Sequence, residues 1–177
     1  MKALLIIDMQ QGSFIPYSLR HDTKGTIDRI NTLAARFREK NLPVIYIQHD
    51  GTKENCFLPG SPDWQLLPEL YVAASDHLVS KTANDCFYKS ELSKLLEQHQ
   101  ITSLFITGCA TDFCVDATVK SALSKDYHVT VIADAHTTAD RAIGSAAKVI
   151  EHYNWMWAEM TPTKYPLQVK TAAEAEV

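Results

Sequence analysis

Residues 104–123, LFITGCATDFCVDATVKSAL, decide the fold and hold the candidate site. An apolar run ends at Gly108, and a helical pattern begins only a few residues later, over 112–126. A buried strand that turns directly into a helix is the repeating unit of α/β proteins with a parallel sheet. Two cysteines, Cys109 and Cys114, lie in this turn, so either could be a reactive thiol or a small buried side chain.

The same alternation of strand and helix extends along the chain. Apolar runs predict buried strands, and apolar residues at helical spacing predict helices. The predicted strands are 2–8, 43–49, 76–81, 101–108 and 128–135, with a final edge strand at 155–160 (WMWAEM). The predicted helices are 26–40, 90–99, 112–126 and 139–153, and about 168–177 form a frayed or helical tail. This order predicts an α/β fold, a three-layer αβα sandwich around a parallel sheet.

Length and composition limit the class of protein. A chain of 177 residues is expected to form a single domain, 1–177. A net charge of -4 disfavours nucleic acid as a partner. The apolar run at 3–7 is too short for a secretory signal and no segment is long enough to span a membrane, so we expect a cytoplasmic protein with no membrane partner. Its four cysteines are expected to stay reduced there.

Three chemically active side chains follow predicted strands. Asp8 ends the first strand, Lys81 ends the third, and Cys114 follows the fourth. Parallel strands present their carboxyl ends at one sheet edge, where a carboxylate, an ammonium and a thiol would suit nucleophilic acyl transfer. If Thr111 or Asp112 caps the following helix, its positive end favours the Cys114 thiolate. The alternatives are a structural ion pair and a buried, inert cysteine.

The segment 50–75 contains three prolines and two glycines and is long for a connection, which is typical of functional loops. We expect a pocket wall for a small, partly apolar or planar substrate from four aromatic residues, with core packing or a subunit interface as the alternative. These are Phe14, Trp64, Phe87 and Tyr88. His136 follows the fifth strand on the same edge, and loop capping is favoured for it over substrate contact.

Four segments resemble the isochorismatase-like cysteine hydrolases in order and spacing. They are LLIIDMQQGSF (4–14), LPGSPDWQLLPEL (58–70), SKTANDCFYKSEL (80–92) and ITGCATDFCVDATVKSAL (106–123), the last followed by HVTVIADA. The resemblance implies a Rossmann-like six-stranded parallel sheet of order 3-2-1-4-5-6. It also implies a catalytic triad of Asp8, Lys81 and Cys114, an oxyanion hole from the amides of Ala110 and Cys114, and a cis peptide bond between Cys109 and Ala110.

The implied reaction is hydrolysis of a carbon–nitrogen bond of a small amide or ureido compound through a thioester at Cys114. One alternative is vinyl-ether hydrolysis by Asp8 and Lys81 without covalent catalysis. Another is a thiol redox protein or sensor using Cys109 and Cys114, and a third is an inactive assembly module. Nicotinamidases of this superfamily carry an Asp-x-His metal pair, whereas here His49 and Asp50 are adjacent. We therefore expect no metal and no cofactor. The resemblance also implies a homo-oligomer, a dimer or tetramer, for which the apolar segment 155–160 offers a contact surface.

Overall fold

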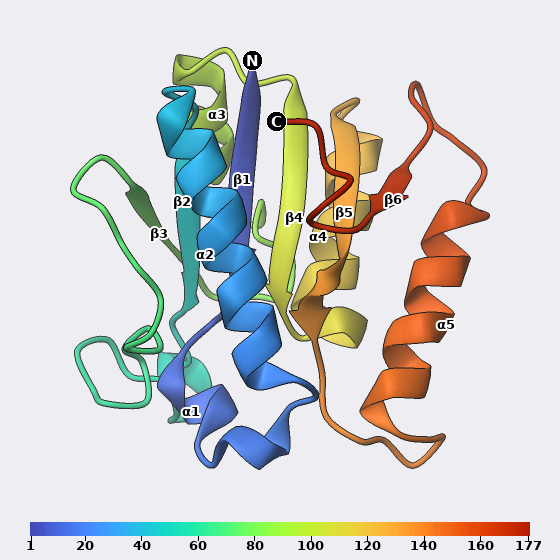
Figure 1. Cartoon of the computed structure of the whole chain (residues 1–177). Coiled ribbons are helices and arrows are strands. Elements are labelled where there is room, and N and C mark those ends of the chain that lie inside the picture. Colours follow the sequence, from blue (N-terminus) through green and yellow to red (C-terminus); the bar gives the residue numbers. More distant parts are fainter.

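The computed structural model describes residues 1–177 and contains one six-stranded sheet (Figure 1). The strands lie in the order β3-β2-β1-β4-β5-β6, and each neighbouring pair is parallel. Their bounds are β1 Lys2–Ile7, β2 Val44–His49, β3 His77–Lys81, β4 Ser103–Cys109, β5 His128–Thr137 and β6 Gln168–Lys170. The predicted order 3-2-1-4-5-6 is therefore confirmed.

The central strand β1 shows why these residues form a buried sheet. Residues 3–7 are all fully buried, and successive side chains point to opposite faces of the sheet. Leu4 and Ile6 enter one hydrophobic core, whereas Leu5 and Ile7 enter the other. A strand covered on both faces reads as a continuous apolar run, which is the pattern found in the sequence.

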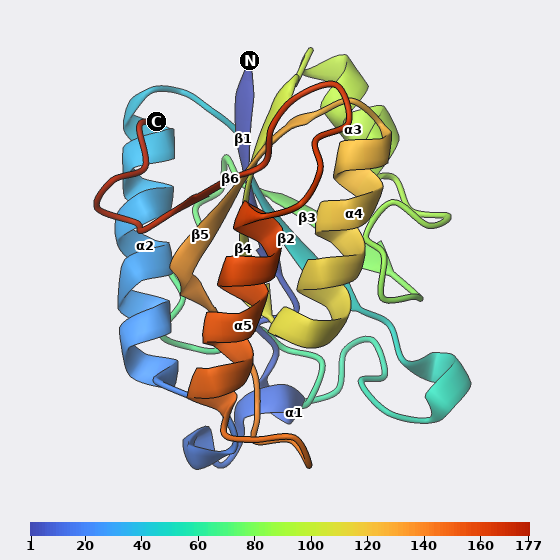
Figure 2. The ribbon, with the colours of Figure 1, turned by 90° about the vertical axis from the view of Figure 1, so that its right-hand side faces the viewer.

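Helices cover both faces of the sheet and complete the three layers (Figure 2). On one face, α2 packs through Ile27, Ile30, Leu33 and Phe37. On the other, α3, α4 and α5 contribute side chains such as Leu92, Val119 and Trp157. The helix bounds are α1 Gln11–Phe14, α2 Thr23–Glu39, α3 Leu92–Gln98, α4 Asp116–Ser124 and α5 Ala146–Ala158.

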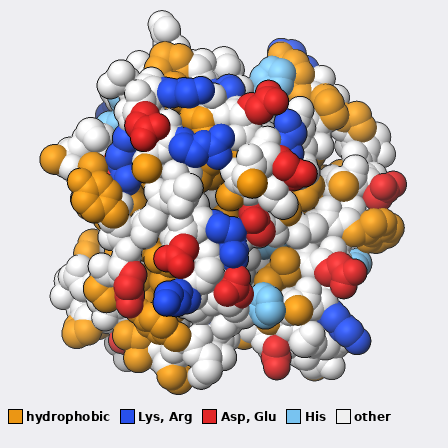
Figure 3. All heavy atoms as spheres, in the orientation of Figure 1, with side chains coloured by type: hydrophobic (Ala, Val, Ile, Leu, Met, Phe, Trp, Pro, Cys, Tyr) orange, Lys and Arg blue, Asp and Glu red, His pale blue; other side chains and the backbone are white.

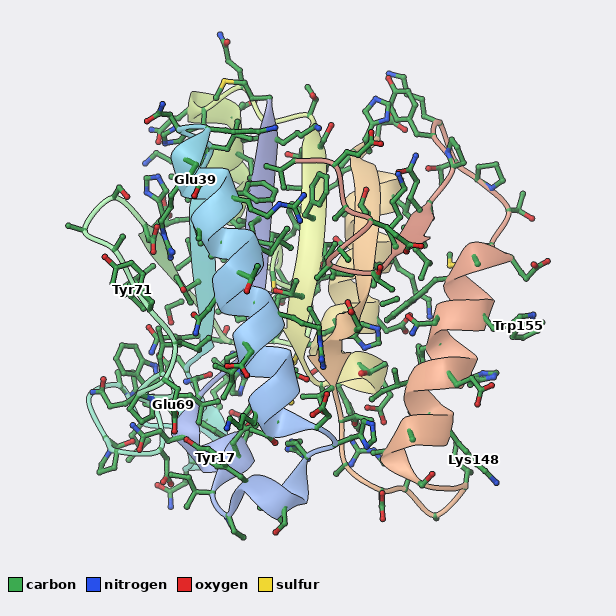
Figure 4. All side chains as sticks on the ribbon, viewed as in Figure 1. Tyr17, Glu39, Glu69, Tyr71, Lys148 and Trp155 are labelled. Atoms are coloured by element: carbon green, nitrogen blue, oxygen red, sulfur yellow. The ribbon has the colours of Figure 1, made fainter.

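The last predicted helix, 139–153, and the predicted edge strand, 155–160, are wrongly positioned along the chain. Helix α5 begins at Ala146 because Ser145 caps it, its side chain accepting from the Lys148 amide, so residues 139–145 form a turn instead. The helix then continues through most of the predicted strand at 155–160, because Val149, Tyr153 and Trp157 recur every four residues on its core face. Trp155 points away from the sheet into solvent (Figure 4).

The edge strand is β6, which belongs to the segment expected to be a frayed or helical tail. Val169 pairs with Val131 of β5, and Ala172 and Ala175 are buried beside α2. Arg36 of α2 donates a hydrogen bond of 2.7 Å to the carbonyl oxygen of Ala172. The C-terminal segment is therefore packed rather than frayed, because its alanine side chains are buried and its carbonyl groups accept hydrogen bonds from α2.

The long segment between β2 and β3 contains one short 3-10 helix, Thr52–Glu54. It lies beside α1, where the amides of Gln11 and Gly12 donate to its carbonyl groups, and beside the turn after α1. Gln10 forms a bridge with Leu66, and the Tyr17 hydroxyl donates to Glu69 at 2.6 Å (Figure 4). This segment therefore closes one side of the sheet edge where the strands end. On the face drawn in Figure 3, acidic, basic and apolar side chains are interspersed. None of the helices combines the length and apolar character required to cross a membrane.

Candidate active site

The carboxyl ends of three strands bring Asp8, Lys81 and Cys114 together, at the lower edge of the sheet in Figure 1. Lys81 Nζ lies 2.6 Å from Asp8 Oδ2 and 3.3 Å from Cys114 Sγ. The Lys81 side chain is fully buried and that of Asp8 is 9% exposed, so this is not a solvated surface pair. One ammonium group thus contacts both a carboxylate and a thiol.

The turn after β4 depends on a glycine. Gly108 has φ +115°, and a Cβ there would overlap the carbonyl oxygen of Ile7 in the neighbouring strand β1. The peptide bond between Cys109 and Ala110 is cis. Residues Thr111–Val115 then form a π-helical turn that leads directly into α4 and carries Cys114. The close approach of β4 to β1 therefore sets where this turn begins, beside Asp8.

The predicted helix caps at Thr111 and Asp112 are wrong, because both side chains are held by other partners. The Thr111 hydroxyl is 2.8 Å from His136 Nδ1, and Asp112 accepts two hydrogen bonds from Arg141 and one from Thr138. These contacts tie the turn to β5 and to the segment after it. No side chain caps the π-helical turn.

His136 is a positioning residue rather than a wall of the cleft. Its Nε2 donates to Asn154 Oδ1 at 2.9 Å, because the Asn154 amide nitrogen is already used by the carbonyl of Ala133. Nδ1 is thereby the acceptor for the Thr111 hydroxyl. Burial lowers the pKa of His136 to about 4, so the ring is neutral at pH 7. The role of His136 is structural, but it is not the expected capping of the following loop, because its partners lie 25 and 18 residues away in the sequence.

The expected effect of the helix start, which favours the Cys114 thiolate, is outweighed in this site. Burial and the neighbouring Asp8 carboxylate raise the pKa of the Cys114 thiol well above its ordinary value, and the Lys81 ammonium only partly offsets them. Burial acts to lower the pKa of Lys81, but the adjacent Asp8 carboxylate raises it by more, so the pKa of Lys81 lies above its ordinary value. The resting site is therefore a neutral thiol beside a carboxylate–ammonium pair.

A cleft of about 290 Å³ opens onto these groups. Its lining residues are Asp8, Gln10, Ser13, Arg20, His49, Phe57, Asn84, Cys109, Ala110, Phe113, Cys114 and Arg141. The backbone N–H of Ala110 has no acceptor within the protein and lies beside Cys114 in this lining. A second hollow of the same volume surrounds Lys2, Ser103 and His128 at the opposite ends of the strands, away from the thiol.

The four aromatic residues predicted for the pocket wall are not among those lining the cleft. Phe14 is fully buried in the core under α2, and Phe87 stacks on Tyr127 in the core on the other face. Tyr88 is 48% exposed outside the cleft, and the Trp64 carbonyl, rather than its ring, serves the site by accepting from Gln10. The alternative of core packing therefore applies to Phe14 and Phe87.

The aromatic walls are instead Phe57 and Phe113. Gln10, Asn84 and Phe113 each lie within three residues of a predicted triad residue, a signal that sequence reasoning could have used. Arg20, Phe57 and Arg141 come from irregular segments, where no periodic pattern predicts the direction of a side chain.

The His49 and Asp50 pair does not belong to a cluster of metal-ligating side chains. His49 Nε2 is 3.9 Å from Glu54, and Asp50 accepts hydrogen bonds from the amide and hydroxyl of Thr52. No three His, Cys, Asp or Glu side chains come together in a ligating arrangement. All four cysteines are free. Burial raises the pKa of Cys109 to about 12, which makes it a poor partner for thiol exchange.

Comparison with known proteins places the chain in a family. The isochorismatase domain profile matches residues 2–164. A streptothricin hydrolase of Streptomyces noursei is 31% identical over 139 residues, which cover 78% of this chain and 50% of the relative. A ureidoacrylate amidohydrolase of Pseudomonas syringae pv. syringae is 28% identical over 170 residues, covering 75% of this chain and 69% of the relative. A solved isochorismatase family protein superposes with a TM-score of 0.87 at 30% identity, covering 96% of this chain and 98% of that one. The chain spans about half the length of the streptothricin hydrolases it matches. By these matches and its fold, this chain belongs to the isochorismatase family.

Proposed function

We propose that the protein is a cysteine hydrolase that cleaves a carbon–nitrogen bond of a small amide or ureido compound through a thioester at Cys114. The observation that carries the proposal is the contact of one buried ammonium, Lys81, with both Asp8 and Cys114 at the edge of a cleft. Relatives named as hydrolases and amidohydrolases support this reaction class. The cleft volume of about 290 Å³ supports a small-molecule substrate.

In the first half of the reaction, the Cys114 sulfur attacks the substrate carbonyl carbon while its proton passes to Asp8. Asp8 Oδ2 is engaged by Lys81, whereas Oδ1 is buried and has no partner, so Oδ1 is free to accept the proton. A neutral resting thiol needs this base, because the high pKa of Cys114 leaves little thiolate at pH 7. Lys81 stays charged and holds Asp8 in place.

The tetrahedral intermediate carries a negative oxygen that needs hydrogen-bond donors. The amides of Ala110 and Cys114 are proposed to supply them, and the unpartnered Ala110 N–H supports this role. Losing one such donor typically raises the barrier by about 2.7–4 kcal/mol. Asp8 then returns its proton to the leaving nitrogen, the carbon–nitrogen bond breaks, and a thioester remains on Cys114.

In the second half, water attacks the thioester. Asp8 takes a proton from that water, the carbon–sulfur bond breaks, and the proton passes to the sulfur, which restores the starting thiol. Each proton that Asp8 accepts is returned, so the cycle needs neither an oxidant nor a second substrate.

The proposal is tested by turnover of a library of N-carbamoyl amino acids and primary amides, read as ammonia release. We expect Cys114→Ala to abolish release and Cys114→Ser to retain only a small fraction. Cys56→Ala is the matched control, because Cys56 is exposed and lies outside the cleft lining, and it should keep full turnover. Full activity in Cys114→Ala would contradict the covalent route and select non-covalent hydrolysis by Asp8 and Lys81.

A further inference from the structure

One arginine of this chain differs from the other four. Arg29 and Arg38 pair with Asp22 and Asp76, Arg141 pairs with Asp112, and Arg36 donates to carbonyl oxygens of the C-terminal segment. Arg20 has no salt bridge, and its buried Nε has no hydrogen-bond partner. Buried polar groups in native proteins are nearly always satisfied. In this cleft, Asp8 Oδ1, His49 Nδ1 and Arg20 Nε are all unpartnered, and Arg20 is the one cation among them, so a bound anion could satisfy it.

Arg20 lines the same cleft as Asp8 and Cys114. It lies in the lining together with Cys109 and Ala110. Burial dominates the pKa of the Cys109 thiol, and the charge of Arg20 and its side-chain contact with the sulfur act to lower that pKa, so the sulfur is a weak neutral neighbour of the guanidinium and not a counterion. Cys109 begins the turn that carries Cys114. The guanidinium therefore borders the space into which a substrate carbonyl must enter.

The charges around the cleft leave Arg20 uncompensated. Lys81 neutralises Asp8 at 2.6 Å, and Arg141 neutralises Asp112 at 2.7 Å. Burial and the Lys81 ammonium lower the pKa of His49, which keeps its ring neutral at pH 7. Summed over the lining side chains, one positive charge remains, and it is that of Arg20.

A neighbouring hollow also includes Arg20 in its lining, together with Asp22 and Asp140. Neither carboxylate offsets the guanidinium. Asp22 is held by Arg29 at 2.5 Å, and Asp140 accepts from the Ala146 amide at 2.8 Å. The charge of Arg20 is therefore not neutralised by a carboxylate of that hollow either.

We propose that Arg20 binds a carboxylate of the substrate, so that the substrate class is a monoanionic amide or ureide in which a carboxylate accompanies the scissile carbonyl. This inference rests on the proposed function for the position of that carbonyl. A planar guanidinium donates to both oxygens of a carboxylate in parallel, and such bonds are short and strong because both partners are charged. One anionic group would satisfy the buried Nε and neutralise the cleft.

The test uses two alkylating reagents of similar size, iodoacetate and iodoacetamide, which differ in charge. In each reaction the Cys114 sulfur forms a bond to carbon, iodide leaves with the electron pair, and the thiol proton passes to solvent. Rate constants for Cys114 are read by peptide mass mapping, which separates it from the exposed Cys56. The ratio of the two rate constants cancels any change in the reactivity of the thiol itself.

We expect the iodoacetate-to-iodoacetamide ratio to fall about tenfold, or about 1.4 kcal/mol, in Arg20→Gln. Arg20→Lys should retain much of the ratio, because it keeps the charge. Lys53→Gln is the matched control, since it removes an equal charge from an exposed loop after β2, and it should leave the ratio unchanged. On the unmodified protein, acetate should slow labelling by iodoacetamide more than acetamide does, which keeps the test valid if Arg20→Gln fails to fold.

An unchanged ratio in Arg20→Gln, or an equal fall in Lys53→Gln, would overturn the carboxylate assignment while leaving the hydrolase proposal intact. Equal protection by acetate and acetamide would overturn it in the same way. If neither iodoacetate nor iodoacetamide labels Cys114 in the folded protein, that result would instead contradict the nucleophilic thiol, and the carboxylate inference with it.

Discussion

Replacing Lys81 by methionine would remove the buried ammonium that joins Asp8 to Cys114. The Nζ–Oδ2 distance of 2.6 Å gives an attraction of about 6 kcal/mol at an effective dielectric constant of about 20. Part of this attraction offsets the cost of taking Lys81 itself out of water. The net loss expected on breaking a buried pair is about 3–5 kcal/mol, because the Asp8 carboxylate is left buried without a counterion.

The assay is urea unfolding at pH 7 followed by circular dichroism. With a slope of about 2 kcal/mol/M, a loss of about 4 kcal/mol lowers the midpoint by about 2 M. The double variant Asp8→Asn with Lys81→Met should be more stable than the sum of the two single changes implies, since neither charge is then unpaired.

Lys120→Met provides the matched control. Lys120 pairs with Asp116 at the same distance of 2.6 Å, but its side chain is 51% exposed. Asp116 is 13% exposed, but it keeps the hydrogen bond from Trp157 Nε1 when Lys120 is replaced. A helical pair with a solvated ammonium contributes about 0.3–0.5 kcal/mol, so its loss should barely move the midpoint. If Lys81→Met destabilised the protein no more than Lys120→Met does, burial would not be what makes the Asp8–Lys81 pair important for stability.

Three further predictions test the turn and the surface. The folded-state pKa of His136, about 4, lies below the ordinary 6.5, so the unfolded chain binds the proton first and stability is lost as the pH falls from 6.5 towards 4. The loss reaches roughly 3 kcal/mol. Urea unfolding measured between pH 6.5 and 4 should show that the free energy of unfolding depends less steeply on pH in His136→Gln than in the parent protein, and an equal pH dependence in both would contradict the assignment. Gly108→Ala should lower the free energy of unfolding by at least about 1–3 kcal/mol, because of its φ and its overlap with Ile7; an unchanged urea midpoint would contradict this. Homo-oligomer formation stays a prediction, with Trp155, 61% exposed on α5, as its candidate contact; sedimentation velocity should show Trp155→Lys as smaller than the parent, and equal sizes would exclude that contact.

Sequence periodicity predicted the sheet because its strands are buried on both faces. The run at 3–7 is short and apolar throughout, as expected for a strand covered on both faces, and the strand-end rule then placed Asp8, Lys81 and the turn after β4 at one edge. The resemblance to a known family added the sheet order. At 155–160, aromatic residues favoured a strand, but the core contact made by Trp157 keeps the segment helical.

The electrostatic state of the site could not be predicted from helix position. A helix start favours a thiolate, but burial of Cys114 and the adjoining Asp8 carboxylate raise its pKa and outweigh that effect. The walls of the cleft were missed for a different reason. Arg20 and Phe57 lie in segments without regular structure, whose paths depend on contacts such as that between Gln10 and the Trp64 carbonyl.

The most direct measurement of the covalent mechanism is the intact mass of the protein quenched in acid during turnover of a reactive amide or ureide. A thioester intermediate predicts an added mass equal to that of the substrate minus its amine, located on Cys114 by peptide mapping and absent from Cys114→Ala. Sustained turnover with no such adduct, together with undiminished activity in Cys114→Ala, would contradict it.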